Sequence, residues 1–157
     1  MEMNVDLRPA VRDELEKIWK MQIEAFKGLL EVYQDYDMSP EAEGIDKITA
    51  RFEQPWTTYY FIVADGKDVG VIRIVDKKDG SRKRISPLWI MPDERGRGYA
   101  QNAILKAEEI HGAHHWELDT ILQEKGNLHL YEKMGYHQTG KTDKINERMD
   151  IVYYEKD

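Results

Sequence analysis

The feature that most constrains this chain is a pair of glycines, Gly96 and Gly98, between a predicted strand and a predicted helix. The first turn of a helix leaves backbone N–H groups without partners and carries partial positive charge. Glycine lets the backbone approach an anion closely, and Arg95 and Arg97 add positive charge. Residues 95–100 therefore have the properties of a phosphate-binding loop. A tight strand-to-helix turn that binds nothing is the alternative that the loop alone leaves open.

Two familiar phosphate-binding motifs do not fit this loop. The P-loop, G-x-x-x-x-G-K-[ST], has no match in the sequence. The dinucleotide fingerprint, G-x-G-x-x-G, fails because Gln101 stands where its third glycine belongs. Other parts of the sequence must therefore identify the anion.

Hydrophobic periodicity divides the chain into helices and strands. Apolar residues between Val11 and Phe26 recur at spacings of three and four, which is typical of an amphipathic helix, and we expect this helix to end at Gly28. Ser-Pro at residues 39–40 predicts the start of a second helix, and Asp-Gly at 65–66 predicts a hairpin turn. The predicted helices are 11–26, 42–52, 99–112 and 127–134, and the predicted strands are 5–8, 58–64, 69–75, 85–91, 116–122, 137–144 and 149–155.

This order of elements predicts a mixed α/β (α+β) fold around one sheet. A length of 157 residues suits a single domain over residues 1–157, and no repeat, low-complexity segment or linker interrupts the sequence. Pro87 lies inside the predicted strand 85–91. Because proline cannot donate to a sheet ladder, we expect a bulge or a sheet edge at this position.

Composition excludes several classes of site and partner. The absence of cysteine rules out disulfides, cysteine metal sites and a cysteine nucleophile. No apolar run approaches the roughly 20 residues of a membrane helix, and no secretory signal begins the sequence. We therefore expect a cytoplasmic protein without a membrane partner. The 30 acidic and 23 basic residues give a net charge of −7, which disfavours nucleic acid and favours cationic partners such as amines. Solubility alone also explains such a charge.

Three histidines, His111, His114 and His115, cluster near the end of the predicted helix 99–112. No pattern of carboxylates accompanies them. We therefore expect a surface role beside the helix C-terminus, where positive charge is favourable, and no metal site.

Two short blocks carry a resemblance to a known family. Residues 92–100, Pro-Asp-Glu-Arg-Gly-Arg-Gly-Tyr-Ala, resemble the signature R/Q-x-x-G-x-G/A of the GNAT N-acetyltransferase superfamily, with Arg95, Gly98 and Ala100 in its three defined places. Residues 130–136, Leu-Tyr-Glu-Lys-Met-Gly-Tyr, are similar to the L-Y-x-K-x-G-F/Y block of that family. The order of elements is similar across nearly the whole chain. The resemblance implies a GNAT-like acyl-CoA acyltransferase fold, in which about four helices flank a mostly antiparallel sheet of about six to seven strands with a splayed central pair.

The resemblance also implies a cofactor, acetyl-CoA (coenzyme A), and the residues that bind it. The splayed strand would pair with the pantetheine amides, and Pro87 independently supports a disruption there because it has no N–H. An ordinary bulge is the alternative, and Trp89 also suits a plain core position. The implied cofactor-binding residues are Leu88, Trp89 and Ile90 on the strand and Arg95, Gly96, Arg97, Gly98, Tyr99 and Ala100 in the loop.

By the same resemblance, Tyr131 is the catalytic residue that donates a proton to the leaving thiolate of coenzyme A. A core tyrosine is the alternative. The family often places an asparagine seven residues before this tyrosine, but this chain has Glu124 there and Asn127 four residues before. We expect Asn127 to contact the cofactor, to cap the following helix, or both.

The implied reaction moves an acetyl group from acetyl-CoA to a primary amine by direct attack, without an acyl-enzyme. A small-molecule amine is the expected acceptor, and the segment that holds Glu31, Tyr33, Asp35 and Tyr36 is the candidate pocket for it. These acidic and aromatic residues favour a small cationic metabolite, a polyamine or an aminoglycoside over an acceptor with a carboxylate. A peptide N-terminus or a lysine is the alternative acceptor. The same residues also suit a solvated face. The general base stays open, as does a homodimer. A non-catalytic acyl-CoA binding or sensing module on the same fold is the alternative function.

Overall fold

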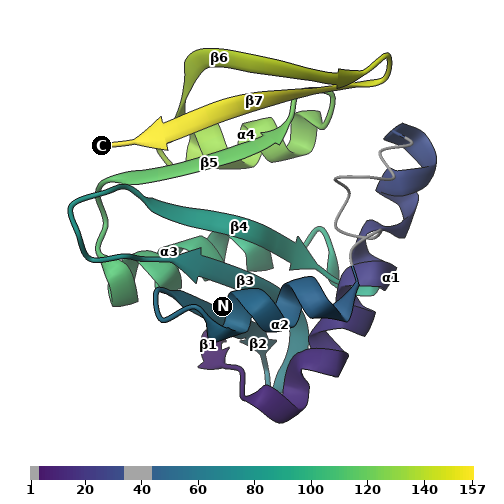
Figure 1. Ribbon diagram of the computed structural model, residues 1–157, viewed down its shortest axis with the longest axis vertical. Helices are drawn as coiled ribbons and strands as arrows, with labels where there is room; N and C mark the ends of the chain where they lie inside the picture. Colours follow the sequence, from purple (N-terminus) through teal and green to yellow (C-terminus); the bar gives the residue numbers. More distant parts are fainter. Residues whose placement is uncertain (1–3, 34–43) are drawn as a thin grey trace.

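The computed structural model describes residues 4–33 and 44–157. Figure 1 shows one twisted sheet with helices on both of its faces. Its seven strands follow the order β1-β2-β3-β4-β5-β7-β6. Every neighbouring pair is antiparallel except β4 and β5, which run parallel. The predicted mixed fold with a mostly antiparallel sheet is therefore confirmed.

The elements follow the predicted order along the chain, with small differences at their ends. The strands are β1 (Val5–Pro9), β2 (Thr57–Ala64), β3 (Lys67–Val75), β4 (Lys83–Ile90), β5 (Trp116–Ile121), β6 (His137–Asn146) and β7 (Met149–Lys156). The helices are α1 (Leu15–Tyr33), α2 (Ile45–Glu53), α3 (Tyr99–His111) and α4 (Lys125–Lys133), with the short 3-10 turns η1 (Arg12–Glu14) and η3 (Pro92–Glu94).

The sheet separates two hydrophobic cores. Alternate residues of β2 point to opposite sides, so Tyr60 and Ile62 pack with α3 and α4, while Tyr59 and Phe61 pack with α1 and α2. A strand that is buried on both faces needs a continuous run of apolar and aromatic residues. This requirement explains the composition of β2.

Helix α1 is longer than the sequence predicts. It continues through Gly28 to Tyr33, so the predicted end at Gly28 is wrong. A glycine inside a helix costs only about 1 kcal/mol, and contacts at the C-terminal end of α1 offset that cost. The side-chain amide of Asn146 donates to the carbonyl oxygen of Tyr33 at 2.8 Å, and the Arg148 guanidinium donates to that of Val32 at 3.3 Å. The predicted start of the second helix at residues 39–40 lies outside the described residues.

The central strands β4 and β5 diverge, as predicted. They pair only at Lys83 with Trp116 and at Arg84 with Glu117, although both strands continue beyond this point. Figure 1 shows the two strands separating after this short contact. The splay leaves the second half of β4 without a strand partner on its β5 side.

The expected irregularity at Pro87 is a bulge between β3 and β4. Ile72 faces Leu88 and Ile74 faces Ile85, so two residues of β4 lie opposite a single residue of β3. That residue is Arg73, whose guanidinium donates to the carbonyl oxygen of Ser86. Because Pro87 lacks an N–H, the ladder is interrupted where the splay begins.

Gly70 sets how closely β3 approaches the functional half of β4. A Cβ atom at this position would lie 2.2 Å from the carbonyl oxygen of Trp89. Replacing Gly70 with alanine should therefore lower the free energy of unfolding by about 3 kcal/mol, the upper range for an overpacked core. Urea denaturation measures this change.

Gly28→Ala is the matched control, because a Cβ at Gly28 meets nothing within 4 Å. This variant should be stabilised by up to about 1 kcal/mol, the difference in helix propensity between glycine and alanine. Equal stability of the Gly70→Ala variant and the unmodified chain would refute the close approach.

Candidate active site

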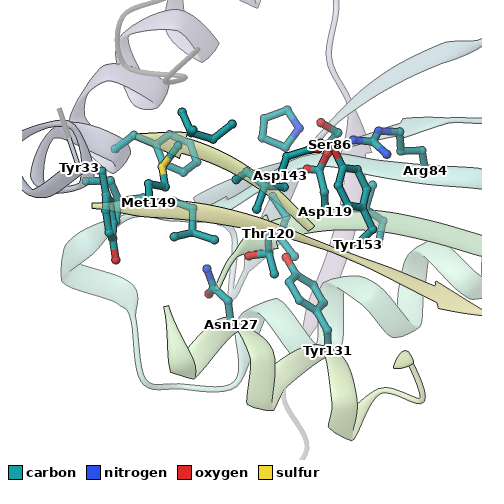
Figure 2. Close-up of a pocket in the computed structure, with 18 of the residues that line it drawn as sticks. Tyr33, Arg84, Ser86, Asp119, Thr120, Asn127, Tyr131, Asp143, Met149 and Tyr153 are labelled. Atoms are coloured by element: carbon teal, nitrogen blue, oxygen red, sulfur yellow. Dashed lines mark hydrogen bonds and ion pairs between the residues drawn. The ribbon is translucent and has the colours of Figure 1, made fainter. Parts of the chain in front are cut away.

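A cavity of about 530 Å³ occupies the space where β4 and β5 separate. Its walls come from both splayed strands, from helices α1, α2 and α4, and from the β6–β7 hairpin. Figure 2 shows polar side chains from the splayed strands, α4 and the β6–β7 hairpin pointing toward it. The polar residues on the strands and α4 are Arg84, Ser86, Asp119, Thr120, Asn127, Tyr131, Asp143 and Tyr153.

The glycine loop lies at the end of β4, between η3 and α3. Gly96 and Gly98 both have φ near +80°, a conformation that side chains other than glycine rarely adopt. Gly98 is the N-cap of α3. Within the described part of the chain, the backbone N–H groups of residues 96–101 have no hydrogen-bond partner. Six free donors at a helix N-terminus fit a pyrophosphate, so the loop suits the predicted cofactor.

Two arginines of this loop have different surroundings. The guanidinium of Arg95 donates to the carbonyl oxygens of Ile90 at 3.0 Å and Ala25 at 2.8 Å. Arg95 therefore ties the end of β4 to α1, and any contact of its side chain with an anion remains a prediction. Arg97 is exposed and lies 4.0 Å from Glu94. Its guanidinium has space to approach a bound anion.

The side chain of Trp89 belongs to the core. It is 3% exposed and packs edge-on against Phe26, with the ring centroids 5.7 Å apart. Leu88 lines the cavity, and the carbonyl oxygen of Ile90 accepts the bond from Arg95. The side chain of Trp89 is therefore a core residue, as the alternative interpretation expects. The backbone of Leu88, Trp89 and Ile90 lies along the edge of β4 that β5 leaves unpaired.

The ring of Tyr131 belongs to the core, while its hydroxyl faces the cavity. Its ring packs among the core aromatics, 6.0 Å from Tyr136 and 6.4 Å from Tyr154 between centroids. Figure 2 shows its hydroxyl directed from α4 into the cavity, where it has no hydrogen-bond partner among residues 4–33 and 44–157. Burial, together with the negative charge of Asp119, raises the pKa of Tyr131 to about 12. The hydroxyl is therefore a persistent proton donor facing the cavity.

Asn127 lies in the cavity but does not cap the helix. Helix α4 begins at Lys125 with Glu124 as its N-cap, so the expected capping role of Asn127 is wrong. The helix starts two residues earlier than predicted, which places Asn127 in its first turn. The side chain lines the cavity beside Tyr131 (Figure 2), and a cofactor contact stays a prediction.

The predicted acceptor pocket is only partly assembled by the structure. Tyr33 lines the cavity, and its hydroxyl donates to Glu124 at 3.0 Å. Burial and this carboxylate raise the pKa of Tyr33 to about 12. Glu31 is exposed on α1 and does not line the cavity. Asp35 and Tyr36 lie outside the described residues.

Sequence reasoning missed a group of charged residues in the same cavity. Arg84 on β4 forms an ion pair with Asp119 on β5 at 2.6 Å. Opposite them, the Tyr153 hydroxyl donates to Asp143. One available signal was the occurrence of Asp119 inside a strand, because aspartate is depleted in strands.

The expected surface role of His111 is wrong. Its side chain is only 12% exposed. The ring lies between Asp76, 3.0 Å from Nδ1, and the Tyr60 hydroxyl, 2.9 Å from Nε2. The described residues contain no group of three histidine, aspartate or glutamate side chains that could hold a metal ion. No helix within these residues is long and apolar enough to cross a membrane.

Comparisons with known proteins agree with this geometry. Residues 15–136 match the family model of the acetyltransferase (GNAT) family. A search of curated protein sequences found no match. Spermidine N-acetyltransferase from Vibrio cholerae, solved with CoA and spermine, has a TM-score of 0.74 at 18% identity, over 96% of this chain and 93% of that one.

Two further structures extend the likeness. PaiA N-acetyltransferase from Thermoplasma acidophilum, solved with coenzyme A, has a TM-score of 0.67 at 15% identity, over 99% of this chain and 100% of that one. An acetyltransferase from Salmonella typhimurium that modifies the N-terminal serine of a 50S ribosomal subunit protein has a TM-score of 0.73 at 13% identity, over 96% and 92%. At such identities the solved structures establish a shared fold.

The family match shows more than a shared fold. It confirms the predicted enzyme class, an acetyl-CoA-dependent N-acyltransferase, and the predicted cofactor. The matched residues include the glycine loop, both splayed strands and α4, while the β6–β7 hairpin lies outside the match. This chain belongs to the acetyltransferase (GNAT) family.

Proposed function

We propose that this protein transfers an acetyl group from acetyl-CoA to a small-molecule primary amine, by direct attack while both are bound. The observation that carries the proposal is a series of three features that follow one another along β4. The series starts at the free N–H groups of residues 96–101, follows the edge of β4 that β5 has left, and ends at the Tyr131 hydroxyl. Acetyl-CoA has its pyrophosphate, amide and thioester groups in this order, and the thioester supplies the acetyl group.

Each feature of this series has a separate task. The free N–H groups of the loop hold the pyrophosphate. The backbone of Leu88, Trp89 and Ile90 pairs with the pantetheine amides, which completes the interrupted sheet. The contacts that position thioester and amine supply much of the rate, because a bound pair reacts as a single molecule.

Proton transfers accompany the bond changes. The amine nitrogen forms a bond to the acetyl carbon, and the bond from that carbon to sulfur breaks. Tyr131 donates a proton to the sulfur. Asp119 accepts the proton that the amine loses, directly or through a water molecule. The ion pair with Arg84 fixes the orientation of the Asp119 carboxylate in the cavity.

A non-catalytic acyl-CoA binding module is the competing function. It predicts that acetyl-CoA binds but that no amine releases coenzyme A from it. Measuring thiol release against a panel of amines separates the two functions. Binding without turnover on any amine would support the module.

The glycine loop can be tested by Gly98→Asp. Aspartate adds a negative charge beside the pyrophosphate and does not readily adopt the φ of +80° at this position. We expect the affinity for coenzyme A to fall at least about tenfold, a change of ~1.4 kcal/mol, in isothermal titration calorimetry. Gly66→Asp is the control, since Gly66 has φ +81 in a hairpin turn with nothing within 4 Å of its Cβ position. Unchanged affinity in Gly98→Asp would remove the loop from the site.

Tyr131→Phe tests the proton donor. We expect kcat to fall about 100-fold, with little change in the affinity for coenzyme A. Because the pKa of Tyr131 is raised to about 12, the hydroxyl stays protonated throughout the neutral and mildly alkaline range. The loss should therefore be equal at about pH 7 and about pH 9.

Tyr136→Phe is the matched control for this variant. Tyr136 packs against Tyr131, and its buried hydroxyl has no hydrogen-bond partner in the described part of the chain. This variant should retain normal turnover. Normal turnover in Tyr131→Phe would leave Tyr131 with a packing role alone.

Asp119→Asn tests the proton acceptor. We expect kcat to fall about 100-fold near neutral pH, and less near pH 10, where a larger share of a primary amine is already neutral. Glu117→Gln is the control, because Glu117 lies on the same strand but does not line the cavity. An equal loss in both variants, or no loss in Asp119→Asn, would contradict the assignment.

A further inference from the structure

A buried arginine interrupts the apolar sequence of β3. Arg73 is 9% exposed, and its neighbours in the strand, Ile72 and Ile74, are completely buried. Removing a cation from water costs free energy unless a hydrogen bond or an opposite charge compensates for it. Charged side chains are therefore rare in the interior of a sheet. An arginine at this position indicates a contact that an apolar side chain could not make.

That contact is with the bulge of β4. The Arg73 guanidinium donates from Nε to the carbonyl oxygen of Ser86, and Arg73 lies opposite both Ser86 and Pro87. A bulge interrupts the backbone ladder and bends the strand that contains it. Pro87 has no N–H with which to restore the ladder. The side chain of Arg73 therefore supplies a hydrogen bond to β4 where the ladder is interrupted, and a charged donor makes this bond strong.

Arg73 is itself held in place from the other side. Its cross-strand partner on β2 is Tyr59, and the guanidinium carbon lies 6.0 Å from the centre of the Tyr59 ring. This distance is at the outer limit of a cation–π contact. The guanidinium thus lies between an aromatic ring on β2 and the Ser86 carbonyl on β4, which restricts its movement.

The bend lies between two parts of β4 that have different surroundings. Before it, Arg84 is the last residue of β4 that pairs with β5. After it, Leu88 begins the edge that β5 leaves unpaired. Ser86, Pro87 and Leu88 line the cavity, whereas Arg73 is not among the described residues that line it. Arg73 therefore acts on a bound ligand through the course of β4 and not by contact.

Building on the proposed function, we infer that Arg73 is a positioning residue for acetyl-CoA. Its bond to Ser86 fixes the bend of β4, and the bend sets the direction in which the backbone of residues 88–90 meets the pantetheine arm. The glycine loop, which holds the pyrophosphate, has a separate support, because Arg95 bonds the end of β4 to α1. Loss of the Arg73 contact should therefore weaken the binding of the pantetheine arm and leave the binding of the nucleotide half intact.

The first experiment compares coenzyme A with its nucleotide half in the Arg73→Met variant. Methionine has no donor, and its flexible apolar side chain suits a core position. The nucleotide half, adenosine 3′-phosphate 5′-diphosphate, has the pyrophosphate but no pantetheine arm. In isothermal titration calorimetry, the Kd for coenzyme A should rise at least about tenfold, while the Kd for the nucleotide half stays within about twofold. An unchanged Kd for coenzyme A would overturn the inference, as would an equal rise for both ligands, which is the effect of a general structural defect.

Arg82→Met is the matched control. Arg82 also donates to backbone carbonyl oxygens of the sheet, those of Trp116 at 3.1 Å and Lys156 at 3.2 Å, but it precedes β4 and its bulge. Its loss should leave the Kd for coenzyme A within about twofold. A rise equal to that of Arg73→Met would mean that the loss of either arginine has this effect, and it would overturn the inference.

Arg73→Lys tests the hydrogen bond with a smaller change. Lysine keeps a charged donor but lacks the planar guanidinium, so the Kd for coenzyme A should rise only about threefold. No recovery of affinity relative to Arg73→Met would contradict the inference. Thermal melting verifies that each variant folds. If Arg73→Met does not fold, Arg73→Lys decides: a rise for coenzyme A alone supports the inference, and unchanged affinity overturns it.

These binding measurements do not depend on acetyl transfer. If no amine is acetylated but Arg73→Met loses affinity for coenzyme A and not for its nucleotide half, the proposed function fails and the inference holds. If an amine is acetylated and Arg73→Met binds coenzyme A normally, the inference fails and the proposed function holds. If the unmodified chain does not bind coenzyme A, both fail.

Discussion

After Arg84, strands β4 and β5 no longer pair, and the rest of the site depends on this divergence. Two neighbouring parallel strands normally satisfy each other's backbone groups along their whole length. Here that pairing ends after two residue pairs, just before the bulge opposite Arg73, where Pro87 has no N–H. Buried backbone groups need partners, so an open sheet of this kind is complementary to a ligand that brings its own amides. The cavity, the free loop donors and the Tyr131 hydroxyl are all arranged around the opening.

The opening is supported from both sides of the sheet. On one face, Trp89 packs against Phe26 of α1, and Arg95 bonds the end of β4 to the same helix. On the other face, α3 and α4 bury their apolar residues against the sheet. Gly70 allows β3 to approach β4 closely enough to hold it in place. The contacts of Trp89, Arg95 and Gly70 do not involve β5, so they hold β4 independently of the strand from which it separates.

The sequence predicted the parts of this site that are local. The glycine loop before α3 and the bulge at Pro87 each belong to a short segment whose residue types reflect its backbone geometry. The end of α1 was not predictable in this way, because contacts from Asn146 and Arg148 extend the helix past Gly28. The pairing of Arg84 with Asp119 was also missed, since it joins residues 35 positions apart on strands that meet only in the folded sheet. His111 similarly looked exposed until the fold placed it between Asp76 and Tyr60.

The hydrogen bonds between α1 and the β6–β7 turn have a consequence for how such a site can change. They join residues 113 and 116 positions apart and lie at one end of the hairpin, beside the cavity. The supports of the loop and of β4 lie elsewhere, in the sheet and its two cores. Insertions or substitutions in the hairpin turn can therefore reshape this end of the cavity while the glycine loop and β4 keep their geometry. The shape of the cavity and the geometry of the loop therefore depend on separate sets of contacts, and either can change without the other.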